Sequence, residues 1–258
     1  MTAAAALGGR TALVTGASRG LGRAIAVRLA EAGAAVAVNY REQADAAEAV
    51  VREIEARGGR ALAVRADIAD AAQVREMAAR VMSSLGAVDI LVNNAGVSHR
   101  GDLGDADDAQ IEEMRRINVD GLIAVTRAVV DGMKTRRFGR IVNVASIAAL
   151  GTAMVGTTFY AATKAAVVVL TRRFALELGP HGITVNAIAP GFVLTDMAAA
   201  GRTEADFAAI AARTMIRRIG RPEDIAHAVA FLVAPESGFL TAQVLTVDGG
   251  RMDYIGHP

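Results

Sequence analysis

The sequence predicts an α/β domain with a doubly wound parallel sheet, and three observations support this prediction. Short β-rich apolar runs alternate with long Ala-rich helical patterns along the chain. Most of these runs are continuous rather than alternating, which is typical of parallel strands covered by helices on both faces. A glycine-rich turn joins the first run to the first helical pattern. This βαβα order, with right-handed crossovers, predicts a Rossmann-type fold with a seven-stranded parallel sheet flanked by helices.

Each strand is expected where an apolar run is bounded by turn residues, and each helix is expected between two strands. The expected strands are Thr11–Thr15, Ala35–Asn39, Arg60–Arg65, Ile90–Asn93, Arg140–Ala145, Thr184–Ala189 and Val244–Val247. The expected helices are Gly20–Ala32, Asp45–Arg57, Ala71–Leu85, Asp107–Arg136, Phe159–Leu178 and Pro222–Val233. The sequence has no linker rich in Pro, Gly and Ser and no repeat, so residues 1–258 are assigned to a single domain.

The composition argues against several classes of function. Charged residues make up 21% of the chain and the net charge is +1, so neither a nucleic acid nor an anionic membrane is expected as the main partner. There is no cysteine and the four histidines are scattered, so thiolate catalysis and a metal site are not expected. The sequence shows no signal peptide and no apolar run long enough to span a membrane. These features favour a cytoplasmic protein.

A glycine-rich turn follows the first expected strand, with the spacing G-x-x-x-G-x-G. Glycine lets the backbone turn tightly and lets a pyrophosphate approach the helix N-terminus, where free N–H groups favour anions. The turn predicts a dinucleotide site, while a tight strand–helix connection is the alternative explanation. The residues expected to bind the cofactor here are Gly16, Ser18, Arg19, Gly20, Leu21 and Gly22.

The end of the second strand bears on which dinucleotide binds. An NAD-selective site would place an acidic residue here, about 20 residues past the glycines, to bind the ribose 2′-hydroxyl. Positions 36 to 41 contain no acid, and Arg41 and Arg19 would suit a 2′-phosphate. We therefore expect NADP(H). NAD(H) is the alternative, because Glu42 is the nearest acid and both arginines would then be solvated surface residues.

Tyr160 and Lys164 are four residues apart on an expected helix, so they share one face. A phenol with a pKa near 10 is a poor acid–base catalyst at neutral pH, and a neighbouring cation lowers that pKa. Alone, this spacing also fits a buried tyrosine beside an exposed lysine. Ser146 closes the preceding strand and Asn118 lies in the helix before it. The four residues together are the expected catalytic set.

The motifs in the chain resemble the signature of classical short-chain dehydrogenases/reductases. They are the Thr15–Gly22 loop, Asn93-Asn-Ala-Gly96, Asn118, Ser146, Tyr160-x-x-x-Lys164, Pro190-Gly191, Asp67, Gly220-Arg-Pro-Glu-Asp224 and Asp248-Gly-Gly250. The resemblance covers residues 7–250, with the motifs in the family's order. It implies an enzyme that transfers a hydride between a nicotinamide cofactor and a carbonyl or secondary alcohol.

The resemblance also implies a role for each matching position. Tyr160 would exchange a proton with the substrate oxygen, which Ser146 would hold. Lys164 would lower the pKa of Tyr160 and bind the nicotinamide ribose, and Asn118 would anchor a water linking Lys164 to solvent. The other implied cofactor contacts are Asp67 and Ile68 at the adenine, Thr195 at the carboxamide, and Asn39, Tyr40, Arg41, Asn94, Ala95, Gly96, Tyr160, Lys164, Pro190, Gly191 and Val193 along the cleft.

One spacing departs from the family pattern. Ser146 and Tyr160 are fourteen residues apart, where thirteen is usual. The extra residue is placed in the loop Gly151–Thr158, which would border the substrate, and Thr157 or Thr158 could share the hydroxyl role. Ser146 is preferred because it ends a strand and therefore sits on rigid scaffold.

The subgroup that the chain resembles most is the 3-oxoacyl-acyl-carrier-protein reductases, which dock an acidic carrier protein through two basic residues. Arg137 matches the first, and His181 stands in place of the second. A free small alcohol, sugar or steroid-like ketone is therefore an alternative substrate. Residues 194–217 break the rhythm of strands and helices and are interpreted as a substrate lid, and the tail Arg251–Pro258 could cap the pocket. The apolar lid residues are Met197, Phe207, Ile210 and Met215, which a core-facing helix would also explain.

The helices Asp107–Arg136 and Phe159–Leu178 are rich in Ala and Val on more than one face, which a monomer would leave exposed. The family pairs these helices across a two-fold axis and uses the last helix and strand at a second axis, so a homotetramer with 222 symmetry is expected. A non-catalytic dinucleotide-binding redox sensor is an alternative of another class. Such proteins usually lose the tyrosine or the lysine, and this chain has both.

Overall fold

The sheet is seven-stranded and entirely parallel, as predicted. The structure, a computed structural model, describes residues 6–195 and 202–253. The strand order is β3-β2-β1-β4-β5-β6-β7. The strands are β1 (Thr11–Val14), β2 (Ala35–Tyr40), β3 (Arg60–Arg65), β4 (Val88–Asn93), β5 (Gly139–Val144), β6 (Ile183–Pro190) and β7 (Val244–Val247).

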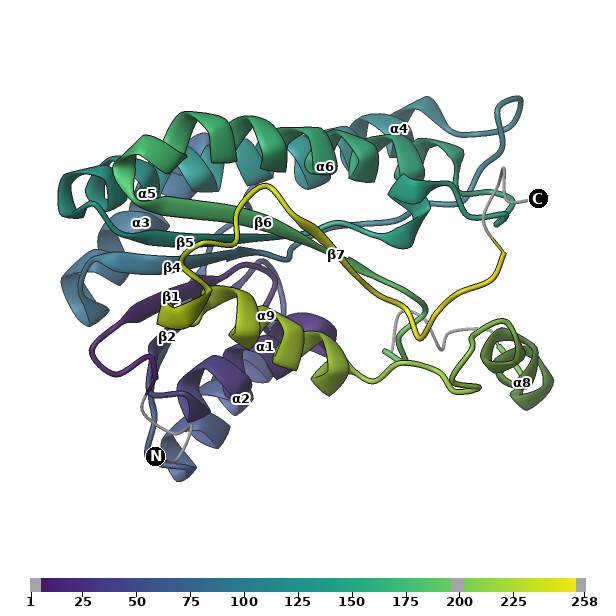
Figure 1. Cartoon of the computed structure of the whole chain (residues 1–258). Coiled ribbons are helices and arrows are strands. Elements are labelled where there is room, and N and C mark those ends of the chain that lie inside the picture. Colours follow the sequence, from purple (N-terminus) through teal and green to yellow (C-terminus); the bar gives the residue numbers. More distant parts are fainter. Residues whose placement is uncertain (1–5, 196–201, 254–258) are drawn as a thin grey trace.

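Helices cover both faces of the sheet, which explains why the central strands β1 and β4 are buried along their whole length (Figure 1). One layer consists of α1 (Gly20–Glu31), α2 (Ala44–Ala56) and α9 (Pro222–Val233). The other consists of α3 (Ala71–Leu85), α4 (Asp108–Arg115), α5 (Leu122–Arg136) and α6 (Thr158–Leu178). Within residues 6–195 and 202–253, short 3₁₀ turns lie at Ile147–Leu150, Gly179–His181 and Pro235–Ser237. No helix in the described part of the chain is long and apolar enough to cross a membrane.

The prediction of a single helix over Asp107–Arg136 is wrong in detail, because a π-helical segment interrupts the helix. This segment, Arg116–Gly121, separates α4 from α5. Two tertiary contacts account for the irregularity: the Asn118 side chain bonds the backbone of Val97, and a Cβ at Gly121 would lie 2.8 Å from the Ile68 side chain. Sequence periodicity does not report such contacts, and π-helical segments are frequent at functional sites.

A ladder of buried polar side chains fixes α5 and α6 against the sheet. Asn93 Nδ2 donates to Asn143 Oδ1 at 2.9 Å and to Thr126 Oγ1 at 3.1 Å. Asn143 Nδ2 in turn donates to Thr171 Oγ1 at 2.9 Å. Because a buried amide without a partner costs free energy, this ladder specifies the register of α6 on β5. It therefore helps to place Tyr160, which lies in the first turn of α6.

The expected lid contains a helix that the sequence analysis did not predict, α8 (Glu204–Ala212). A capping box starts this helix, because Thr203 and Asp206 satisfy each other's backbone N–H groups. In Figure 1, α8 lies beyond the end of the sheet, at the right of the view. Met197 and residues 254–258 lie outside the described residues, so their predicted roles stay untested.

Candidate active site

A cleft of about 420 Å³ opens at the carboxyl ends of β1 and β4, where the strand order reverses. Open α/β sheets bind ligands at this position. All twenty residues expected to bind the cofactor line the cleft, Tyr160 and Lys164 among them, and so does Ser146. The lining residues that the sequence analysis did not select are Gln43, Ala66, Val97, Ser98, Ile117, Val144, Ala145 and Phe192. Most of them lie next to or near a predicted residue in the sequence, which is the signal that could have found them.

The glycine loop leaves its backbone open to the cleft. Gly16 and Gly20 have φ values of +61° and +55°, a region that favours glycine. A Cβ at Gly22 would lie 2.3 Å from Gly16 O, so no larger residue fits. Among the described residues no side chain caps the start of α1, whereas Asp70 and Asp107 cap α3 and α4. The first N–H groups of α1 are thus available to an anion such as a pyrophosphate.

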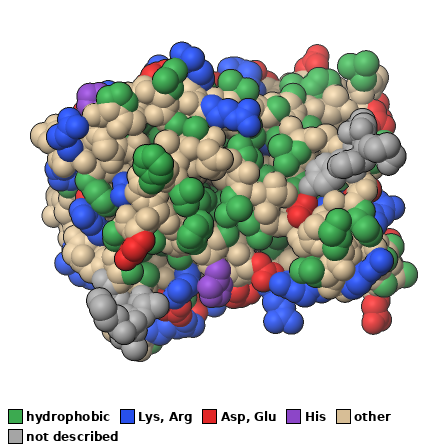
Figure 2. Space-filling view, in the orientation of Figure 1, with side chains coloured by type: hydrophobic (Ala, Val, Ile, Leu, Met, Phe, Trp, Pro, Cys, Tyr) green, Lys and Arg blue, Asp and Glu red, His purple; other side chains and the backbone are tan. Residues whose placement is uncertain are grey.

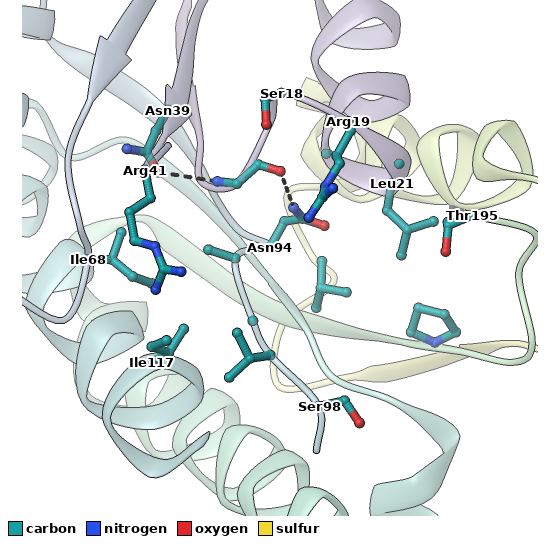
Figure 3. A pocket seen from close by; sticks show the side chains of 18 of the residues that line it. Ser18, Arg19, Leu21, Asn39, Arg41, Ile68, Asn94, Ser98, Ile117 and Thr195 are labelled. Carbon is teal, nitrogen blue, oxygen red and sulfur yellow. Dashed lines mark hydrogen bonds between the residues drawn. The ribbon is translucent and has the colours of Figure 1, made fainter. Parts of the chain in front are cut away.

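Two asparagines brace this loop from neighbouring strands, as Figure 3 shows. Gly16 N donates to Asn39 Oδ1 at 3.2 Å. Asn94 Nδ2 donates to Thr15 O at 2.8 Å and to Gly16 O at 3.1 Å. Both asparagines were expected to contact the cofactor, but their amide groups are engaged in shaping the loop. The structure therefore adds a positioning function that the motif alone did not reveal.

Arg19 and Arg41 extend into the same cleft from the glycine loop and from the end of β2 (Figure 3). Arg41 Nη2 lies 2.9 Å from Glu42 Oε1, and both side chains are largely exposed. The acid that would favour NAD is therefore paired with the arginine that would favour NADP. Because an exposed ion pair contributes little free energy, a phosphate could compete with Glu42 for Arg41.

The environment of Tyr160 differs from the prediction. Burial raises the pKa of the Tyr160 phenol, and a hydrogen bond with Ser146 partly opposes this shift. We expected a pKa lowered by Lys164. The physical reason for the difference is that burial disfavours the phenolate more than its surroundings stabilise it. The phenol is therefore protonated at neutral pH, the form that can donate a proton.

Ser146 is the hydroxyl that accompanies Tyr160. Its side chain caps the short turn at Ile147, because Ala148 N donates to Ser146 Oγ at 3.1 Å. The alternative hydroxyl of Thr157 instead donates to Met154 O at 2.7 Å. The strand-ending serine therefore lies at the tyrosine, whereas Thr157 closes a turn of the adjacent loop.

Lys164 is buried and reaches across from α6 to β5. Its Nζ donates to Val144 O at 2.8 Å and lies 5.8 Å from the centre of the Tyr160 ring. Burial lowers the pKa of Lys164 from 10.5 to about 8. A Cβ at Gly96 would lie 3.4 Å from Nζ, so the glycine of the Asn-Asn-Ala-Gly motif makes room for the lysine.

Asn118 stands behind the cleft rather than in its lining. Its Oδ1 accepts from Val97 N at 2.8 Å, while its Nδ2 donates to Val97 O at 2.9 Å and to Thr163 Oγ1 at 3.0 Å. The side chain therefore ties the Val97 backbone to α6 at the residue before Lys164. Its water-anchoring role stays a prediction.

Comparisons with known proteins agree with this geometry. A family model described as enoyl-(acyl carrier protein) reductase matches residues 16–251. The 3-oxoacyl-acyl-carrier-protein reductase FabG of Staphylococcus epidermidis is 42% identical over 242 residues, which are 93% of this chain and 98% of that protein. The hydroxy(phenyl)methylsuccinyl-CoA dehydrogenase subunit BbsD of Thauera aromatica is 42% identical over 247 residues, 96% of this chain and 98% of that protein.

One solved structure is similar to this chain in both fold and sequence. It is a short-chain dehydrogenase from Burkholderia cenocepacia in complex with NADP, with a TM-score of 0.87 and 44% identity, covering 95% of this chain and 98% of that one. A likeness at this level extends over the sheet, the cleft and the catalytic helix. The chain belongs to the short-chain dehydrogenase/reductase family, as an oxidoreductase that uses a nicotinamide dinucleotide and acts on carbonyl or alcohol groups.

Proposed function

We propose that this protein is an NADP(H)-dependent reductase of 3-oxoacyl thioesters. The observation that carries the proposal is one continuous cleft. It joins a glycine loop flanked by two arginines to a half-buried Tyr160 beside Ser146. Such a cleft can hold a dinucleotide along its length and present a carbonyl to a proton donor.

The residues that would hold the cofactor fit its chemistry. Gly16 and Gly22 leave no space for a side chain, and the start of α1 presents backbone N–H groups, as a pyrophosphate requires. When bound, the nicotinamide supplies the hydride that a carbonyl reduction needs. Pro190 and Gly191, at the end of β6, would border the nicotinamide end.

Tyr160 would donate its proton to the substrate oxygen, since its phenol is protonated at neutral pH. Ser146 would hold the same oxygen by a hydrogen bond. Lys164 would carry a positive charge below a pH of about 8 and stabilise the phenolate left after proton transfer. Asn118 would act indirectly, by fixing the Val97 backbone against α6.

Preference for NADP(H) over NAD(H) would come from Arg19 and Arg41. Guanidinium groups pair well with a phosphate dianion, and both side chains reach the cleft. The similar structure from Burkholderia cenocepacia is a complex with NADP, which supports this cofactor. Glu42 weakens the discrimination because it shares Arg41.

An apolar rim around the substrate end supports an acyl substrate. Two exposed apolar side chains lie near cleft-lining residues in the sequence: Leu194 between Val193 and Thr195, and Leu150 four residues after Ser146. Phe192 lines the cleft and packs against Phe207 of α8, with ring centroids 6.4 Å apart. Such a rim suits an aliphatic or aromatic acyl group better than a polar sugar acid. Two relatives are named for thioester substrates, which points the same way.

The experiment that tests the proposal is a substrate panel with NADPH and with NADH. It should contain a short and a medium-chain 3-oxoacyl-CoA, the same acyl groups on acyl carrier protein, a free ketone and a polar hydroxy acid. We expect the highest kcat/KM with NADPH and a 3-oxoacyl thioester. Higher kcat/KM with the free ketone or the hydroxy acid would show that the substrate proposal is wrong.

Carrier docking through Arg137 and His181 would require a second copy of the chain. Arg137 Nη2 donates to Pro180 O at 3.1 Å, so the two residues are neighbours just past the end of α6. Tyr160 lies at the opposite end of this 21-residue helix, about 30 Å away at 1.5 Å per residue. Antiparallel pairing of α6 with its copy would bring the docking residues of one chain to the cleft of the other.

Two exposed apolar faces support the proposed homotetramer. Val169 and Leu176 are exposed on α6. Phe231, Phe239 and Leu245 are exposed on and around α9 and β7, and Figure 2 shows hydrophobic side chains gathered across the middle of that face. Two separate self-complementary faces are what 222 symmetry requires.

A Leu176→Glu variant tests both assembly and docking. It should lower the mass measured by light scattering at micromolar concentration, and it should reduce activity on carrier-linked substrate more than on the CoA thioester. Met82→Glu, an exposed apolar residue on α3, is the matched control. A monomeric wild type would rule out the tetramer, and unchanged carrier selectivity in a dissociated variant would rule out docking across copies.

A further inference from the structure

The segment after β7 forms a short antiparallel ladder with residues 213–215, which follow α8. We call residues 249–253 the C-terminal strap. Met215 N donates to Gly250 O at 3.0 Å, and Met252 N donates to Arg213 O at 3.1 Å. Thr214 and Arg251 form the bridge between them. A Cβ at Gly250, where φ is +70°, would lie 2.9 Å from Met215 Sδ, so the two segments are closely packed.

The strap also reaches the loop that carries the extra residue between Ser146 and Tyr160. Ala153 N donates to Asp253 O at 3.0 Å. On its other side this loop is bridged to the segment after the Asn-Asn-Ala-Gly motif, because Gly101 N donates to Gly156 O at 3.2 Å and Gly156 N donates to Asp102 Oδ1 at 2.8 Å. The strap therefore joins two walls of the substrate end that lie far apart in the sequence.

A buried ion pair lies within the strap. The Arg251 side chain is 2% exposed, and both its Nε and its Nη2 bond the Asp253 carboxylate, the latter at 2.7 Å. Arg213 Nη1 approaches the same carboxylate at 3.3 Å. The hydrogen bond from Arg251 is the main reason that the pKa of Asp253 is lowered. Replacing Asp253 removes the carboxylate that pairs with the buried Arg251 guanidinium, which is destabilising locally.

We propose that the Arg251–Asp253 pair is a positioning device for the substrate end. It holds the strap in the conformation that fixes the α8 region on one side and the loop 151–157 on the other. Arg251 and Asp253 thereby determine the KM of the carbonyl substrate without touching the cofactor. This inference rests on the proposed function for its kinetic test, and it accounts for the extra loop residue, which lengthens the segment that Asp253 contacts.

Asp253→Asn tests the pair, because it keeps the size of the side chain and removes its charge. We expect KM for the 3-oxoacyl thioester to rise by about ten-fold or more, while the Kd for NADPH, measured by fluorescence, stays within about two-fold. Arg57→Gln breaks an exposed ion pair on α2 and should change neither quantity. A KM for Asp253→Asn within about two-fold of the wild-type value would overturn the proposal.

The double variant Arg251→Met/Asp253→Asn provides an independent test, which can be used even if one of the single variants is unstable. It leaves no unpaired buried charge, so its KM should rise no further than in either single variant. Additive effects of the two substitutions would contradict a device that acts as a unit. Amide exchange over residues 151–157 and 204–216 should speed up in the variants and stay unchanged over the glycine loop. If the wild type reduces no thioester, the proposed function fails, while this exchange pattern still decides the positioning role; uniform or unchanged exchange would overturn it.

Discussion

The two ends of the cleft are built in different ways. At the cofactor end, buried strand residues such as Asn39 brace a loop whose glycines have no space for a side chain. At the substrate end, the walls lie off the sheet and are joined by a few backbone hydrogen bonds and the Arg251–Asp253 pair. The first end depends on close packing of the scaffold, and the second on contacts between segments distant in the sequence.

This difference indicates which positions of the chain tolerate substitution. A substitution in the glycine loop meets backbone atoms that cannot move without disturbing the sheet. The loops of the substrate end can vary in length or polarity while the hydride-transfer geometry stays intact. A single scaffold can therefore keep one cofactor chemistry and serve different carbonyl substrates.

The largest effect is expected from Tyr160→Phe, which removes the proton donor and keeps the ring, and so tests whether catalysis and cofactor binding are separate. We expect kcat to fall by at least about 10², the usual scale of general acid–base catalysis, while NADPH affinity is retained. Steady-state kinetics and NADPH fluorescence titration measure the two quantities. Near-normal turnover would refute the assignment of Tyr160.

Gly22→Ala should act at the cofactor end alone. The new Cβ would lie 2.3 Å from Gly16 O, so the loop must shift and NADPH affinity should fall by about ten-fold or more. Gly104→Ala is the matched control, since a Cβ there meets nothing within 4 Å. Comparable NADPH affinity in the two variants would show that the loop is not built as described.

The variants Arg41→Ala and Glu42→Gln test which dinucleotide the protein prefers. Loss of the arginine should raise KM for NADPH by about five- to ten-fold and leave KM for NADH nearly unchanged. Glu42→Gln should have a smaller and opposite effect, because it frees Arg41 for the 2′-phosphate. A wild type with higher kcat/KM for NADH would mean that Glu42 or a backbone group serves the ribose instead.

The smallest expected effect is a pH dependence from Lys164. With its pKa lowered to about 8, Lys164 loses its charge as the pH rises through that value, and kcat/KM for reduction should drop to about half there. The folded chain then binds fewer protons than the unfolded chain between the two pKa values, so the stability cost of the buried charge is relieved over that range. Lys134→Met removes the other, exposed lysine and should leave the profile unchanged, whereas Lys164→Met should abolish this ionisation. A rate independent of pH through this range in the wild type would contradict a charged Lys164.

Much of the cofactor end could be predicted from the sequence, because its signals are local. Gly16, Gly20 and Gly22 occupy backbone positions that only glycine fits, and the spacing of Tyr160 and Lys164 follows from helix geometry. The strands were also predicted within two residues at each end, since parallel buried strands are nearly continuous apolar runs.

Two of the features that were missed depend on contacts between distant residues, and the third, α8, has a local signal. The π-helical segment forms where Asn118 meets Val97 and Gly121 meets Ile68. The direction of the pKa shift of Tyr160 depends on its burial, which no local pattern encodes. Helix α8 has a capping box at Thr203 and Asp206 that sequence inspection could have recognised.

The sequence by itself determined the sheet, the glycine loop and which side chains are proposed as catalytic, because each follows from local backbone preference or from a short motif. Only the tertiary structure decided how those side chains are charged and held. Burial raises the pKa of Tyr160 and lowers that of Lys164, and Asp253 holds a loop 100 residues earlier in the chain through Ala153 N. Desolvation and long-range hydrogen bonding exist only once distant segments have packed together, so no local pattern can report them.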